Sequence, residues 1–123
     1  MYNLIVDSGN TTIKMFLFVD GEIAQKMVCD ELPELLPTLK ANVSLDKIDR
    51  CIVSSVSISQ SEIAEVLRPF FPVLEFSPRL NLPIIIKYGT PETLGSDRVA
   101  AVVGAVSRYP DRNVLVIDSG TAI

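Results

Sequence analysis

Two short stretches of the sequence share the same three residues, Asp-Ser-Gly, directly after an apolar run. Residues 4–14 read LIVDSGNTTIK, and residues 115–123 read LVIDSGTAI. In each, a carboxylate closes an apolar run, and a glycine and a hydroxyl- or amide-bearing turn follow. Turned backbone N–H groups with such side chains suit an anion, and Asp7 beside a phosphate could hold Mg²⁺ through water while Lys14 adds a positive charge. The alternative is a plain β-turn in which Asp and Asn are only turn formers.

The recurrence of the turn favours the phosphate-binding interpretation. Two such turns from two domains could face each other and hold one polyphosphate between them. The sequence contains neither a GxxxxGK[ST] P-loop nor a GxGxxG motif after a strand, so the usual nucleotide-binding loops are excluded.

A third polar stretch, YGTPETLGSDR at residues 88–98, precedes an apolar helical pattern. Asp97 could accept the proton of a substrate hydroxyl, and Arg98 could bind a substrate carboxylate through its planar guanidinium. The alternative is that Ser96 or Asp97 only caps the helix. The chain has no histidine, which excludes a Ser-His-Asp triad and an imidazole base. We therefore expect any general base to be Asp or Glu rather than Lys or Tyr.

Composition limits the class of partner. The 123 residues are 48% hydrophobic, with 11 basic and 15 acidic residues and a net charge of −4, so we expect a buried core and no nucleic-acid partner. No apolar run is long enough to span a membrane and the N-terminus lacks a signal-peptide pattern, so we expect no membrane association and a cytoplasmic location. Cys29 and Cys51 are expected to be free, buried thiols.

Alternating strands and helices must position these residues. The pattern predicts strands at 3–7, 12–19, 22–28, 50–56, 72–76 and 113–117, with a further extended run at 82–87. It predicts helices at 31–40, 60–68 and 97–108, the first starting near Pro33 and weakened by Pro37, the last buried nearly all round. Asp20-Gly21 predicts a tight hairpin between the second and third strands.

This order predicts an α/β layer fold whose mixed sheet starts with an antiparallel three-strand meander. The long-range repeat suggests a duplicated architecture. On this interpretation residues 1–110 form the first domain, and residues 111–123 are the opening strand and phosphate turn of a second, truncated domain.

DSGNTTIK, YGTPETLGSDR and VIDSGTAI, in this order and spacing, resemble type III pantothenate kinase. The two Asp-containing turns are similar to those of the actin/Hsp70/sugar-kinase superfamily, and the Tyr-x-x-Pro-x-x-x-Gly-x-Asp-Arg segment is typical of this one family. The resemblance implies ribonuclease-H-like (actin-like ATPase) domains with helices on both faces of the sheet, and ATP in the cleft between two such domains.

The resemblance also implies roles for single residues, ATP with Mg²⁺, and a monovalent cation, K⁺ or NH₄⁺. Asp97 would be the general base, and Asp118 would bind the monovalent cation. Asp7 would bind Mg²⁺ through a water molecule. The ATP-phosphate contacts would be Asp7, Ser8, Gly9, Asn10, Thr11, Thr12, Ile13, Lys14 and Thr121, and the pantothenate contacts Tyr88, Gly95, Ser96, Asp97 and Arg98.

The function implied is ATP-dependent phosphorylation of pantothenate to 4′-phosphopantothenate, the first step of coenzyme A biosynthesis, by a homodimer when full length. The 123-residue chain would be a partial and inactive piece of that enzyme. Two alternatives stay open: a non-catalytic regulatory relative on the same fold, and a different small-molecule kinase such as a sugar kinase.

Overall fold

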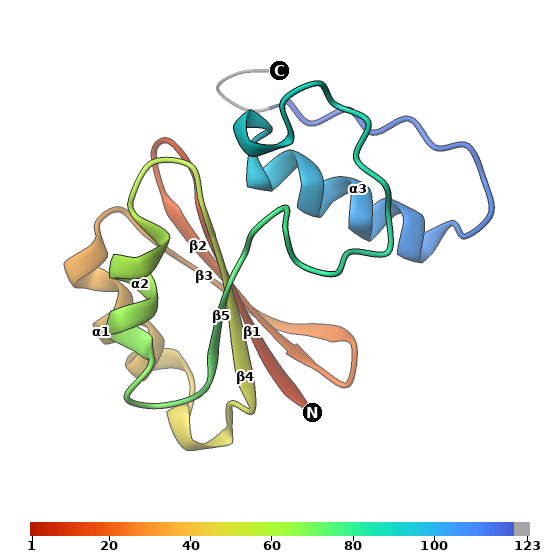
Figure 1. Ribbon diagram of the computed structural model, residues 1–123. Helices are drawn as coiled ribbons and strands as arrows, with labels where there is room; N and C mark the ends of the chain where they lie inside the picture. Colours follow the sequence, from red (N-terminus) through yellow and green to blue (C-terminus); the bar gives the residue numbers. More distant parts are fainter. Residues whose placement is uncertain (120–123) are drawn as a thin grey trace. The chain divides into compact units, whose positions relative to one another are not determined.

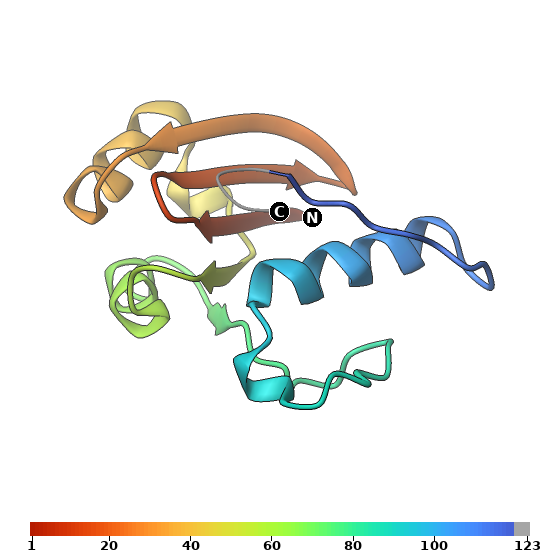
Figure 2. The ribbon, with the colours of Figure 1, turned by 90° about the horizontal axis from the view of Figure 1, so that it is seen from above.

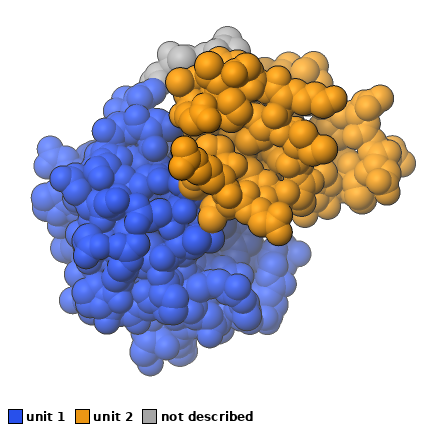
Figure 3. Space-filling model, in the orientation of Figure 1, with its two compact units in different colours: residues 1–76 blue, residues 77–123 orange. Residues whose placement is uncertain are grey.

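The computed structural model describes residues 1–119 of the chain. The chain divides into two compact units, Met1–Phe76 and Ser77–Ile123, coloured separately in Figure 3. The predicted division into domains 1–110 and 111–123 concerns the duplicated family fold and stays a prediction.

The first unit begins with the predicted antiparallel meander. Strands β1 (Tyr2–Ser8), β2 (Ile13–Val19) and β3 (Glu22–Cys29) pair in sequence. Between β2 and β3, Asp20 and Gly21 both have positive φ, 50° and 88°, as a tight two-residue hairpin turn requires. The Asp-Gly signal therefore predicted this turn correctly.

Two parallel strands complete the sheet. Strand β4 (Arg50–Ser55) pairs with β1, and the short β5 (Val73–Glu75) pairs with β4. The order is β3-β2-β1-β4-β5, a five-stranded mixed sheet. Helix α1 (Leu32–Asn42) and a 3₁₀ turn, η1 (Leu45–Lys47), connect β3 to β4, and α2 (Gln60–Leu67) connects β4 to β5, which confirms the predicted mixed α/β fold.

The core lies between the sheet and the two helices. Helices α1 and α2 contact each other and cover the same face of the sheet, as Figures 1 and 2 show. Strand β1 alternates with period two, so Leu4, Val6 and Ser8 are buried on that face while Asn3, Ile5 and Asp7 point to the other. Helices on both faces therefore stay a prediction, since the first unit carries both of its helices on one face.

Helix α1 tolerates the proline that weakened its prediction. Pro33 occupies the first turn, where the missing N–H costs nothing. Pro37 lies inside the helix and removes the hydrogen bond to the carbonyl of Pro33, but both prolines are exposed and water can satisfy that carbonyl. Leu35 and Leu39, fully buried, hold the opposite face of the helix against the core.

The second unit departs further from the predictions. It contains a 3₁₀ turn, η2 (Pro91–Thr93), and helix α3 (Ser96–Arg108). Only Val99 of α3 is buried, so the expectation of a helix buried all round is wrong. Within its described residues this unit has no sheet or second long helix that could cover the other faces of α3.

Residues 113–117, predicted as a strand, form no strand. Leu115 and Ile117 are largely exposed, at 85% and 74%. A strand exists only through pairing, and no strand pairs with this run in the described part of the chain. The extended run at 82–87 is also unpaired. Among residues 1–119 there is no helix long and apolar enough to cross a membrane.

Candidate functional site

The first candidate half-site is the turn between β1 and β2. Strand β1 ends at Ser8, β2 begins at Ile13, and the Gly9 N–H donates to the Thr12 carbonyl at 3.0 Å to close the turn. Asp7 and Lys14 are direct partners in the antiparallel register, both on the sheet face away from the core. Directly opposite residues have Cβ atoms roughly 5 Å apart, so the fold places the Asp7 and Lys14 side chains next to each other.

Gly9 is not needed for the shape of the turn. Among the glycines of residues 1–119, only Gly21 has a positive φ, so any residue could adopt the Gly9 backbone. A Cβ added at Gly9 would meet only the Thr12 carbonyl oxygen, at an ordinary 3.8 Å. The turn therefore leaves open space above the backbone of Gly9.

Side chains of residues 8–13 point in two directions. Ser8 and Ile13 are each 1% exposed and point into the core, so only their backbone groups can reach a ligand. Asn10 and Thr11 are exposed and Thr12 is partly exposed. The donors available at the turn are thus backbone N–H groups with the Asn10 and Thr11 side chains.

A serine-rich segment, residues 54–59, comprises the end of β4 and the loop after it. It lies beside this turn, and sequence reasoning missed it. The Val56 N–H donates to the Ser8 carbonyl at 3.0 Å, and the Ser57 hydroxyl donates to the Gly9 carbonyl at 2.6 Å. The signal was present in SSVSIS, because β1 and β4 are parallel and their carboxyl ends meet at one edge of the sheet. Polar residues after both strands were bound to meet there.

The side chain of Gln60 fixes that loop. Its Oε1 accepts the Ser55 N–H at 3.1 Å, and its Nε2 donates to the Phe76 carbonyl at 2.8 Å. The Ser55 hydroxyl bonds both the N–H and the carbonyl of Ile58. The loop beside the turn is therefore held at several points rather than left free.

The second candidate half-site is the N-terminus of α3, in the second unit. Gly95 is the N-cap and makes no side-chain cap bond, so neither Ser96 nor Asp97 is the N-cap that the capping alternative required. The Asp97 Oδ1 instead accepts the Arg98 N–H at 2.9 Å. A Cβ at Gly95 would lie 2.6 Å from that same Oδ1, so the Asp97 carboxylate occupies the space that any other residue at 95 would need.

The remaining predicted residues are more scattered. Tyr88 is 52% exposed in the loop before η2, in the same unit as Asp97. Asp118 is exposed and follows no strand, contrary to its predicted place at a strand end. Thr121 lies outside the described residues. Within residues 1–119 no group of three or more Cys, Asp or Glu side chains is placed to hold a metal ion.

Neither cysteine is a candidate nucleophile. Both are buried and free, as predicted. Burial raises the pKa of Cys51 to about 12. Burial, and then Glu34 and Asp30, raise the pKa of Cys29. At neutral pH both are therefore thiols rather than reactive thiolates.

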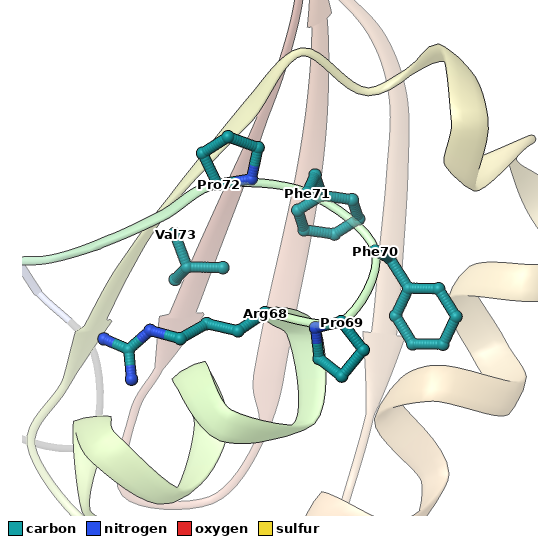
Figure 4. A pocket seen from close by; sticks show the side chains of 6 residues that line it. All are labelled: Arg68, Pro69, Phe70, Phe71, Pro72 and Val73. Atoms are coloured by element: carbon teal, nitrogen blue, oxygen red, sulfur yellow. The ribbon is translucent and has the colours of Figure 1, made fainter.

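Two pockets of the first unit lie away from the turn. One, of about 550 Å³, is an open hollow where α2 ends and β5 begins, lined by Arg68, Pro69, Phe70, Phe71, Pro72 and Val73 (Figure 4). Another, of about 490 Å³, involves Asn3, Arg50 and their neighbours near the amino ends of β1 and β4. In a parallel arrangement these ends lie opposite the edge that carries the DSGNTT turn.

The first unit thus carries exposed donors at the end of a strand, and the second carries a carboxylate next to an arginine at a helix N-terminus. Comparison with known proteins gives the family. A sequence model of the family described as type III pantothenate kinase matches residues 3–123, and the chain belongs to this family.

Curated relatives carry the same name. Type III pantothenate kinase of Christiangramia forsetii is 36% identical over 98% of this chain and 50% of that protein. The proteins of Bacteroides fragilis and Anaplasma phagocytophilum are 39% and 38% identical, over 98% and 95% of this chain and 49% and 50% of theirs. The chain thus spans about half the length of these relatives.

A solved structure, YeaZ from Pseudomonas aeruginosa, matches 62% of this chain and 43% of that chain at 19% identity. The TM-score of 0.42 is too low to support a conclusion about fold or function.

Proposed function

We propose that this chain supplies the first half of an ATP-dependent pantothenate kinase, which makes 4′-phosphopantothenate at the start of coenzyme A biosynthesis. The observation that carries the proposal is the turn at the edge of β1. There, Asp7 faces Lys14 in register, and the backbone at Gly9 is open where glycine is required neither by conformation nor by packing. Close approach of a ligand to the backbone is the remaining reason for a glycine.

In this proposal the turn binds the ATP phosphates. The N–H groups of residues 10–12 and the side chains of Asn10 and Thr11 donate to phosphate oxygens, and Lys14 adds a positive charge. Ser8 and Ile13 contribute backbone groups only, since their side chains are buried. Mg²⁺, held by Asp7 through water, would neutralise phosphate charge when bound.

The α3 N-terminus binds the acceptor. Asp97 takes the proton of the attacking pantothenate hydroxyl, and Arg98 binds the pantothenate carboxylate through two parallel N–H groups. Tyr88, Gly95 and Ser96 line the same substrate region. The Arg98 N–H bond to Asp97 Oδ1 leaves the carboxylate with lone pairs for the hydroxyl proton.

The rest of the assignment follows the family. We infer ribonuclease-H-like domains, with 1–110 the first, and a homodimer at full length. Asp118 and Thr121 belong to the second phosphate turn, where Asp118 binds K⁺ or NH₄⁺ and Thr121 contacts ATP. A lone carboxylate facing phosphates adds repulsion, which a bound monovalent cation offsets.

The test uses the family-length protein, meaning this chain continued to the length of its curated relatives. It is assayed with ATP and Mg²⁺ against pantothenate, pantothenol and a panel of sugars, in Na⁺, K⁺ and NH₄⁺ at matched ionic strength. We expect phosphorylation of pantothenate, discrimination against pantothenol, which lacks the carboxylate, and faster turnover in K⁺ or NH₄⁺. Turnover of a sugar instead would indicate a sugar kinase, and no turnover with any acceptor would indicate a non-catalytic relative. Equal rates in all three cations would contradict the proposed monovalent-cation site at Asp118.

A further inference from the structure

We propose that Ser57, a residue outside all the motifs above, is a positioning residue that orients the phosphate-binding turn. Its hydroxyl holds the Gly9 carbonyl and thereby directs the next backbone N–H toward the ATP phosphates. The inference rests on the proposed function, in which residues 7–14 bind those phosphates, and it adds a residue from a different strand–helix loop.

The contact is short and specific. Ser57 Oγ donates to the Gly9 carbonyl oxygen at 2.6 Å, across 48 residues of sequence. The loop arrives there because the β1–β4 pairing continues one residue beyond β4, through the bond from the Val56 N–H to the Ser8 carbonyl at 3.0 Å. The parallel register of β1 and β4 therefore delivers Ser57 to Gly9.

Because the peptide group is planar, the bond from Ser57 to the Gly9 carbonyl also fixes the direction of the Asn10 N–H. In a trans peptide the carbonyl of one residue and the N–H of the next point in opposite directions, and no cis peptide is present among the described residues. Fixing the Gly9 carbonyl toward Ser57 therefore points the Asn10 N–H to the opposite side of the turn. The Gly9 N–H, which belongs to the preceding peptide group, is bonded to the Thr12 carbonyl, so the peptide groups on both sides of Gly9 each make a hydrogen bond.

The buried hydroxyl of Ser8 supports the same residue. Ser8 is 1% exposed, and its Oγ lies 3.4 Å from Ser57 Oγ. Ser57 has one hydroxyl proton, which goes to the Gly9 carbonyl, so Ser8 is the donor in this weaker contact. Ser8 thus contributes through Ser57, while its own side chain stays out of reach of a ligand.

The kinetic test compares three variants of the family-length protein. Ser57→Ala removes the hydroxyl, Ser57→Thr keeps one, and Ser59→Ala is the matched control in the same loop, at an N-cap that makes no side-chain cap bond. Ser57→Ala should raise the KM for ATP about three- to tenfold, the equivalent of one hydrogen bond. The KM for pantothenate should not change, Ser57→Thr should recover most of the loss, and Ser59→Ala should match the wild type.

A second readout is independent of catalysis. In the 123-residue chain, the NMR signals of the Gly9 carbonyl carbon and the Asn10 amide should move in Ser57→Ala and stay in place in Ser59→Ala. Unmoved signals, or an equal rise in both KM values, would overturn the positioning role. A wild type without kinase activity would overturn the proposed function and, with it, the role toward ATP; signals that still move would then leave Ser57 a structural contact only.

Discussion

At the scale of single residues, the position of the candidate base, Asp97, depends on residue 95 being a glycine without a side chain. The Asp97 carboxylate lies over Gly95, 2.6 Å from where a Cβ would be, and accepts the N–H of Arg98. The atom in the way is the end of a flexible side chain. A Cβ at residue 95 would therefore turn the carboxylate rather than disrupt the backbone.

Gly95→Ala should separate catalysis from stability. In the family-length protein we expect kcat to fall about tenfold to a hundredfold because the carboxylate is displaced, with the KM for ATP unchanged. Loss of a glycine N-cap should lower the free energy of unfolding by at most about 1 kcal/mol. Steady-state kinetics and urea unfolding measure both.

Gly104→Ala is the matched control, since a Cβ there meets nothing within 4 Å in the same helix. It should keep wild-type kcat and stabilise the protein by about 0.5–1 kcal/mol, because alanine is the better helix former. If both variants keep full activity, the steric placement of Asp97 has no catalytic role.

Arg98→Lys should weaken pantothenate binding more than ATP binding. Lysine keeps the charge but loses the two-pronged contact with a carboxylate, so the change is not conservative at such a site. The KM for pantothenate should rise about tenfold or more, the loss of roughly one charged hydrogen bond, and discrimination against pantothenol should shrink. Equal effects on both substrates would argue against a carboxylate contact.

At the scale of elements, the meander depends on a turn that needs glycine. Gly21 has φ of 88°, a region that other residues enter only with strain. Gly21→Ala should therefore lower the free energy of unfolding by about 1–2 kcal/mol, measured by urea denaturation of the 123-residue chain. The matched change Gly9→Ala, where φ is not positive and space is open, should cost much less. Equal losses would mean that backbone strain does not distinguish the two turns.

Local signals predicted the elements that local chemistry decides. Asp20-Gly21 specified a hairpin, and the short apolar run within residues 3–7 specified a strand. Residues 113–117 are a similar apolar, β-branched run, yet form no strand among the described residues, because pairing depends on a partner that the run itself does not encode. The apolar pattern of α3 failed for the same reason, since burial depends on a second layer.

The candidate site divides in a similar way. Asp7, Lys14, Asp97 and Arg98 were predictable because their motifs are contiguous in sequence. Ser57 was not singled out, since its contact with Gly9 crosses two strands and depends on the β1–β4 register. The position of the Asp97 carboxylate over Gly95 depends on the rotamer of Asp97, which no sequence pattern reveals.

At the scale of the whole molecule, the chain carries the proposed phosphate turn in its first unit and the proposed acceptor-binding residues in its second, and it spans about half the length of the curated relatives compared above. In the proposed enzyme two turns enclose the phosphates, and one alone leaves them open to water, where each contact is screened. The 123-residue chain should therefore bind Mg-ATP only weakly and not phosphorylate pantothenate. Calorimetric titration and a coupled assay measure this; sub-micromolar binding or turnover would show that the first half suffices.

The central claim is that Asp97 accepts the proton for a phosphoryl transfer from ATP held at the DSGNTT turn. The most direct measurement is the rate of 4′-phosphopantothenate formation by the family-length protein and its Asp97→Asn variant, in saturating ATP and pantothenate. Asparagine has the same shape but cannot take the proton, so kcat should fall by about 10²–10⁴-fold while the fold and the KM for ATP stay unchanged. A variant that keeps more than half of the wild-type rate would contradict the account.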